Sequence, residues 1–79
     1  MTHNLKILYL YAQLHFRGLK DWELREFDRP FAVGDTIRFT VLEFGFVYYR
    51  KITHIYSDPS FGLADNYIII SISNQEEKL

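Results

Sequence analysis

The eight residues GLKDWELR, from Gly18 to Arg25, constrain the fold of this chain more than any other segment. They follow a helix-compatible run without Gly or Pro, and Gly18 can adopt the left-handed conformation that ends a helix. Polar and apolar residues then alternate, which predicts a strand. On that strand Glu23 and Arg25 face one side, whereas Trp22 and Leu24 face the other. We therefore expect a helix, a chain reversal at Gly18, and a strand.

This reversal predicts a group of charges. Lys20, Glu23 and Arg25 are expected to line one cleft at the end that the helix covers, where they would hold a polar ligand. A surface ion pair beside a turn explains the same pattern, because charged residues on strands are usually solvated. Trp22 is interpreted as a core residue, since large aromatic side chains dominate burial in small domains. Its alternative role is a stacking surface for a nucleobase.

Upstream, residues 4–7 are predicted to form a short strand and residues 8–17 a helix. Gln13 and Arg17 mark a narrow polar stripe, so we expect most of the helix to be covered. His15 falls within the apolar arc. It is interpreted as a hydrogen-bonded core histidine, with a proton-switching or ligand-binding role as the alternative.

Downstream, strands are predicted over residues 36–44, 46–57 and 67–73. In the loop before them, Phe31 and Val33 should point inward, and Gly34 should have a positive φ or lie where a Cβ would clash. Gly45 breaks the first of these strands. The three-residue spacing of Ile52 and Ile55 predicts a bulge in the second.

One helix with about five mostly antiparallel strands predicts an α+β, mainly β fold. A small β-barrel is the economical arrangement, because closure removes exposed sheet edges, and the N-terminal helix should cover its open end. The length of 79 residues predicts a single domain spanning 1–79, with residues 76–79 as a frayed tail.

Composition narrows the function classes. The chain has no cysteine, and its three histidines (His3, His15 and His54) are scattered, so we expect no metal and no cofactor. We expect a soluble, cytoplasmic protein without a membrane segment. The formal net charge of -1 argues against indiscriminate nucleic-acid binding, which needs a broadly basic surface. Any contact with RNA should therefore be local.

The order of residues also carries a resemblance. It rests on the motif G-x-K-x-x-E-x-R, followed at short distance by V-G-D, and on these further matches: Leu5-Lys6-Ile7, Tyr11, Asp28-Arg29, Phe31, Gly62-Leu63 and Tyr67 to Ile72. In these positions the chain resembles a small family of bacterial and phage proteins in the ASCH (activating signal cointegrator homology) superfamily. The resemblance implies a PUA-like β-barrel. It also implies RNA as the partner, bound through a charged cleft beside the helix.

Carried over to this sequence, the binding residues would be Lys20, Glu23 and Arg25, to which we add Trp22 and Arg29. Leu19 stands where the family usually has a second Lys. A different, enzymatic branch of the superfamily resembles the domain and deacylates a modified cytidine with a Lys, a Thr three residues later and a distant Glu, for which this sequence offers no clear match.

This chain keeps that lysine as Lys20 but has Glu23 in place of the threonine, so we expect no catalytic residues and interpret the chain as a binding module. A small amidohydrolase acting on a modified nucleoside remains an alternative. So does an accessory protein that interacts through exposed Tyr48, Tyr49 and Tyr56. The oligomeric state stays open.

Overall fold

The elements of the fold follow the predicted order closely. The computed structural model describes residues 1–76, apart from the side chain of Phe61. Its elements are β1 (Thr2–Ile7), α1 (Tyr9–Phe16), β2 (Trp22–Glu26), β3 (Thr36–Val41), β4 (Val47–Tyr56), a 3-10 turn η1 (Pro59–Phe61) and β5 (Tyr67–Ile72). The strand expected to reach residue 44 ends at Val41, because residues 42–45 form the turn to β4.

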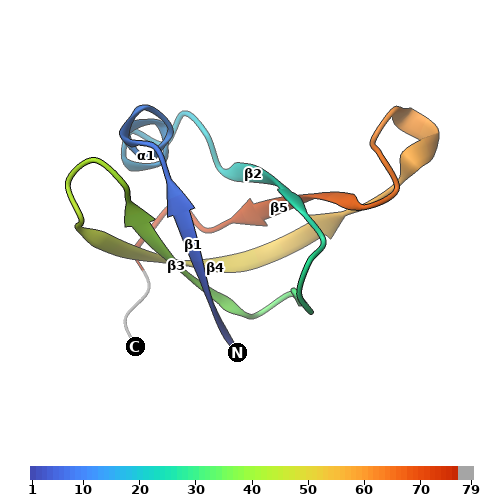
Figure 1. The fold of residues 1–79 in the computed structure, drawn as a ribbon, viewed down its shortest axis with the longest axis horizontal. Coiled ribbons are helices and arrows are strands. Elements are labelled where there is room, and N and C mark those ends of the chain that lie inside the picture. Colours follow the sequence, from blue (N-terminus) through green and yellow to red (C-terminus); the bar gives the residue numbers. More distant parts are fainter. Residues whose placement is uncertain (77–79) are drawn as a thin grey trace.

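The strands form one mixed sheet in the order β1-β3-β4-β5-β2. Strand β1 pairs in parallel with β3, and the other three pairs are antiparallel. The sheet curves strongly into a half-barrel, with α1 at one end (Figure 1). The α+β, mainly β prediction, with five mostly antiparallel strands and a helix over an open end, is therefore confirmed.

The two edge strands are bridged by side chains instead of by a backbone ladder. The carbonyl of Lys6 on β1 accepts a hydrogen bond from Arg25 on β2 at 2.7 Å, and the carbonyl of Asn4 accepts one from Arg29 at 3.0 Å. In a parallel pair, alternate residues direct their backbone groups to the same side, so Asn4 and Lys6 both face the free edge. The expected full closure through strand pairing is thus replaced by two arginine bridges, which occupy otherwise exposed acceptors.

This bridging predicts a measurable contribution to stability. Arg29→Met should lower the free energy of unfolding by about 0.5 to 1.5 kcal/mol, because it removes the hydrogen bond to Asn4. Arg17→Met removes the same charge from an exposed position at the end of α1 and is the matched control. Urea denaturation of both variants measures the difference. Equal stability of the two variants would show that the bridge contributes nothing.

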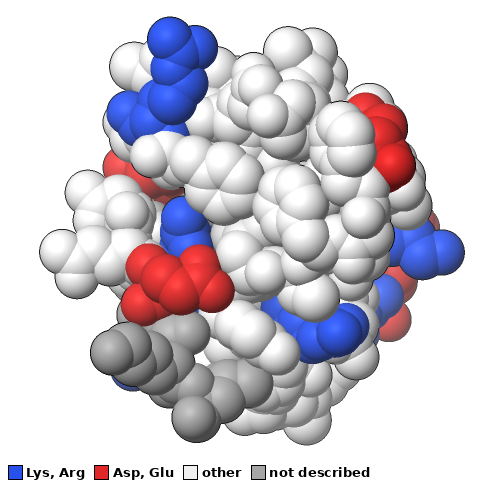
Figure 2. Space-filling model, turned by 90° about the vertical axis from the view of Figure 1, so that its left-hand side faces the viewer, with Lys and Arg blue, Asp and Glu red and all other residues white. Residues whose placement is uncertain are grey.

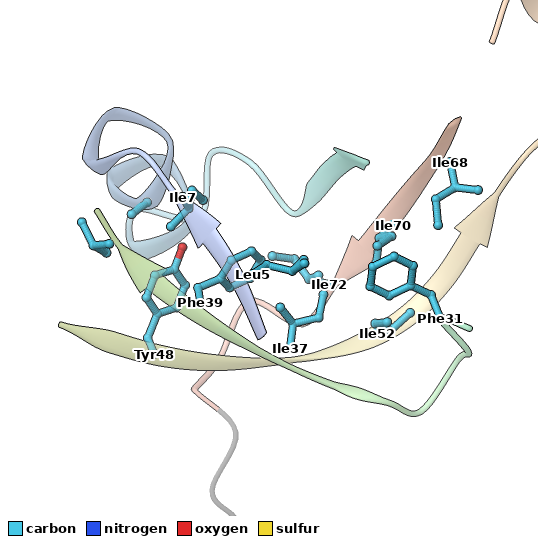
Figure 3. Packing of buried hydrophobic residues seen from close by; sticks show 12 residues of the cluster. Leu5, Ile7, Phe31, Ile37, Phe39, Tyr48, Ile52, Ile68, Ile70 and Ile72 are labelled. Atoms are coloured by element: carbon cyan, nitrogen blue, oxygen red, sulfur yellow. The ribbon is translucent and has the colours of Figure 1, made fainter. Parts of the chain in front are cut away.

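The core lies inside the curve of the sheet. Ile37, Phe39 and Val41 on β3 are completely buried, as their alternation predicts. They pack with buried residues of the other strands and loops, and Figure 3 shows these side chains inside the curve of the sheet: Leu5, Ile7, Phe31, Tyr48, Ile52, Ile68, Ile70 and Ile72. The dense apolar filling supplies the main stabilisation that a short chain requires.

Helix α1 contributes only a narrow face to this core. Ala12 and His15 are its buried residues, whereas Tyr11 and Phe16 remain close to half exposed. The prediction of a mostly covered helix is wrong, because an eight-residue helix capping the end of a half-barrel contacts it along one side. Val33 is likewise exposed at 62%, while Phe31 of the same loop is buried as predicted.

Two glycines and a bulge fix the connections. Gly18 has a φ of +70° and ends α1, and Gly34 has a φ of +94° before β3 begins. Both positive φ values match the sequence prediction, and there is open space at the α-carbon of Gly34. The pairing of β4 with β5 shifts register between Ile52 and His54, which confirms the predicted bulge.

Candidate functional site

A buried glutamate organises the predicted charges. Glu23 on β2 is 6% exposed, and its Oε1 accepts a hydrogen bond from Nζ of Lys20 at 2.5 Å. Nε2 of His15 on α1 lies 3.0 Å from the same oxygen, and a guanidinium nitrogen of Arg25 lies 3.6 Å from Oε2. The chain reversal at Gly18 thus brings three cationic or ionisable groups onto one carboxylate.

Electrostatics keep this carboxylate ionised. Burial by itself would raise the pKa of Glu23, but the neighbouring His15 and Lys20 outweigh burial and lower that pKa below its ordinary value. His15 acts on this carboxylate at close range, since its Nε2 lies 3.0 Å from Oε1 of Glu23. Lys20 and Arg25 against Glu23 leave the cluster one net positive charge.

His15 is anchored on its other side. Its Nδ1 lies 2.7 Å from the hydroxyl of Tyr48 on β4, and both side chains are buried. Burial, and then the charge of Glu23, raise the pKa of Tyr48, so its hydroxyl stays protonated. A continuous polar chain therefore runs from Tyr48 through His15 to Glu23 and Lys20. The interpretation of His15 as a hydrogen-bonded core residue is confirmed.

The surface next to Lys20, at the end of this row of polar side chains, is aromatic. Nζ of Lys20 lies 4.7 Å from the ring centroid of Tyr11 and 4.8 Å from that of Trp22, within cation–π distance of both. Trp22 is 45% exposed and Tyr11 is 43% exposed. The prediction that Trp22 is a core residue is wrong, because Glu23 takes the inward face of β2 and leaves the outward face to Trp22 and Leu24.

The predicted binding arginines are engaged in holding the fold. Arg25 lies within the charge cluster but donates to the backbone of Lys6. Arg29 lies farther along the same gap between β1 and β2, where it donates to Asn4 and pairs with Asp28. The structure therefore brings together Lys20, Trp22, Glu23 and Arg25, and it gives Arg29 a separate set of partners.

The shape of this region requires a correction. The residues that the structure describes enclose no pocket, so the predicted cleft is instead a closed cluster of charges beneath an exposed aromatic surface. Sequence reasoning missed Tyr11, His15 and Tyr48 as members. The available signal was the polar ring of His15 within an otherwise apolar arc, which required a buried partner.

The tyrosines expected to form an exposed interaction surface do not do so. Tyr48 is 3% exposed, and Tyr49 and Tyr56 are half-buried. The prediction of exposed tyrosines is therefore wrong, because Tyr48 faces inward on β4 and hydrogen-bonds His15. Besides Tyr11 and Trp22, the exposed aromatic side chains near α1 are Phe16, Phe44 and Phe46.

Across residues 1–76, no three His, Asp or Glu side chains are grouped as metal ligands. Within the same residues, no helix has the length and apolar character that a membrane crossing demands.

The comparisons with known proteins identify the family. The family model described as Domain of unknown function (DUF3850) matches residues 2–72, a range that spans every element from β1 to β5. No curated protein matches the sequence. Because the matched range covers nearly the whole chain, this protein belongs to the family described as Domain of unknown function (DUF3850).

Proposed function

We propose that this protein is an RNA-binding module of the ASCH superfamily that acts in the cytoplasm and binds single-stranded RNA beside α1. The observation that carries this proposal is the position of Lys20, whose ammonium group lies between two exposed aromatic rings, Tyr11 and Trp22. Proteins that bind single-stranded nucleic acids combine aromatic rings with cations, because every base can stack on a ring and every phosphate carries a negative charge.

The charge balance of the cluster supports this function. Lys20 and Arg25 exceed Glu23 by one positive charge, although the chain as a whole is formally at -1. A phosphate would therefore meet a local excess of positive charge in this region. Glu23 is buried and engaged with Lys20 and His15, so it positions the cation and does not meet a base edge. Specific contact would come from Trp22, Tyr11 and Lys20.

The geometry disfavours the hydrolase alternative. Nζ of Lys20 donates to Glu23 at 2.5 Å and faces the rings of Tyr11 and Trp22, so it is directed at these groups and not at a substrate. The hydroxyl expected three residues after the lysine is replaced by the carboxylate of Glu23, which is itself buried.

The test is titration of fluorescently labelled single-stranded and hairpin RNA at two salt concentrations. Lys20→Ala should weaken binding by about 1 to 3 kcal/mol and lower the salt slope by about one. Trp22→Ala should weaken it by about 1 to 3 kcal/mol with little change in the salt slope, because it removes stacking and no charge. Single-stranded RNA should bind more tightly than the hairpin stem.

Matched controls separate the site from general effects. Lys51→Ala removes one exposed positive charge from β4, and Leu24→Ala trims the exposed neighbour of Trp22 on the same face of β2. Both should bind RNA as the wild type does. Unchanged affinity of the Lys20 and Trp22 variants for every RNA would refute the proposed function.

A further inference from the structure

Arg50 is a buried cation at the end of the molecule that carries α1. It lies on β4, is 4% exposed, and its guanidinium lies 5.0 Å from the ring of Tyr48 and 5.9 Å from that of Phe16. One guanidinium nitrogen donates to the carbonyl of Tyr49 at 2.9 Å. A buried guanidinium is unfavourable unless an anion pairs with it. This position therefore demands a negatively charged partner.

In this structure the partner is Glu76, which follows β5 near the C-terminus. Its Oε2 accepts from Arg50 at 2.7 Å, and its Oε1 accepts from the backbone N–H of Tyr49 at 2.9 Å. Both carboxylate oxygens are thus bound. Glu76 was expected to begin a frayed tail, and its two hydrogen bonds correct that prediction at this residue. The remainder of the expected tail, residues 77–79, lies outside the described residues.

Glu76 contacts Arg50 as a ligand contacts its binding site, from the surface and not from within the core. The side chain of Glu76 is 50% exposed, whereas that of Arg50 is 5% exposed. The segment before it is tied to β4 through Ser73, whose N–H and hydroxyl pair with the backbone of Lys51 at 2.9 and 3.0 Å. Releasing Glu76 would leave this anchor intact. The release would expose a preformed guanidinium and N–H pair.

An exposed aromatic surface adjoins this pair. Phe16 on α1 is 47% exposed, and its ring centroid lies 6.1 Å from that of Phe46, which is 39% exposed. Phe44, in the turn between β3 and β4, lies 6.3 Å from Phe46 and is 64% exposed. Figure 2 shows that much of this end of the molecule is uncharged, with one basic and one acidic patch side by side within the face and other charged side chains at its margins. Clustered exposed aromatic residues mark interaction surfaces.

We propose that Arg50 and the N–H of Tyr49 form a carboxylate-binding site for an acidic peptide segment of a partner protein, and that Glu76 fills it in the free chain. A glutamate or aspartate of the partner replaces Glu76, and an adjacent apolar side chain packs on Phe16 and Phe46. The bound glutamate carboxylate shows which chemistry fits, because one buried positive charge meets one negative charge. The site is distinct from the Lys20 surface and does not depend on RNA binding.

Two dipeptides test the site: N-acetyl-Glu-Phe-amide and its glutamine counterpart, N-acetyl-Gln-Phe-amide. Binding is followed by NMR through the amide of Tyr49. Glu76→Gln removes the intramolecular competitor, whose tethering gives it a high effective concentration, so this variant should bind the Glu-Phe probe at least about tenfold more tightly than the wild type. The Gln-Phe probe should leave the Tyr49 amide unshifted. Gln75→Ala, which keeps Glu76, should behave as the wild type.

A second variant keeps the test decisive if Glu76→Gln is less stable. Phe46→Ala alters an exposed side chain and should weaken binding of the Glu-Phe probe to the otherwise unchanged chain severalfold. Equal affinity of the wild type and Glu76→Gln for the Glu-Phe probe would overturn the proposal, as would equal binding of the two probes. A shift of the Tyr49 amide by single-stranded RNA but not by the Glu-Phe probe would also overturn it, and would assign the site to phosphate.

Discussion

Glu23→Gln is expected to lower the free energy of unfolding by about 3 to 5 kcal/mol, the usual effect of removing one partner from a buried ion pair. Glu23 is 6% exposed and is the anion shared by Lys20, His15 and Arg25. The neutral amide leaves these groups without their counter-charge. Urea denaturation near neutral pH measures the loss, and Glu26→Gln, at an exposed position on the same strand, is the matched control.

A comparison of the wild type with Glu23→Gln at different pH values tests the same charge cluster. The pKa of Glu23 is lower in the folded chain than its ordinary value of 4.5. A lowered carboxyl pKa stabilises the fold at pH values above the unfolded pKa, and that stabilisation is lost as the pH falls through the folded pKa. Below about pH 4.5 the stability of the wild type should therefore approach that of Glu23→Gln. A constant difference between them down to strongly acidic pH would contradict this assignment.

Tyr48→Phe should lower the free energy of unfolding by about 1 to 3 kcal/mol, because it leaves Nδ1 of buried His15 without its hydroxyl partner. The ring is retained, so packing against Phe39 and Phe16 is preserved. Thermal or urea denaturation measures the effect.

Tyr49→Phe is the control for this substitution, since it removes the hydroxyl of the neighbouring, half-buried tyrosine. Its effect should stay within about 0.5 kcal/mol. Similar losses for the two variants would mean that the link between Tyr48 and His15 contributes no more than an ordinary surface hydroxyl.

The sequence predicted the charge cluster only in part. Alternation on β2 correctly placed Glu23 and Arg25 on one face, and the turn at Gly18 brought Lys20 beside them. Alternation does not say which face of β2 points inward. The large side chain of Trp22 led to the prediction that its own face is buried, whereas the face with Glu23 is. The inward face is decided by His15 on α1 and by Tyr48 behind it, which give a buried carboxylate its partners.

The closing of the half-barrel shows a second limit of prediction. The strand patterns predicted five strands, a bulge and the turn glycines, because each is a local property of backbone and burial. The bridges from Arg25 and Arg29 depend on backbone carbonyls of β1, and no side-chain pattern marks a backbone acceptor. Arginines predicted to meet a ligand therefore proved to join the two sheet edges.

The most direct test of RNA binding beside α1 is an NMR titration of the protein with single-stranded RNA, followed through the indole N–H of Trp22. This is the sole tryptophan of the chain, so its signal is unambiguous. We expect it to shift and saturate together with the amides of Tyr11 and Lys20, while Lys51 on β4 stays unchanged. An indole signal that does not move while RNA binds elsewhere, or that stays unmoved by any RNA, would contradict the account.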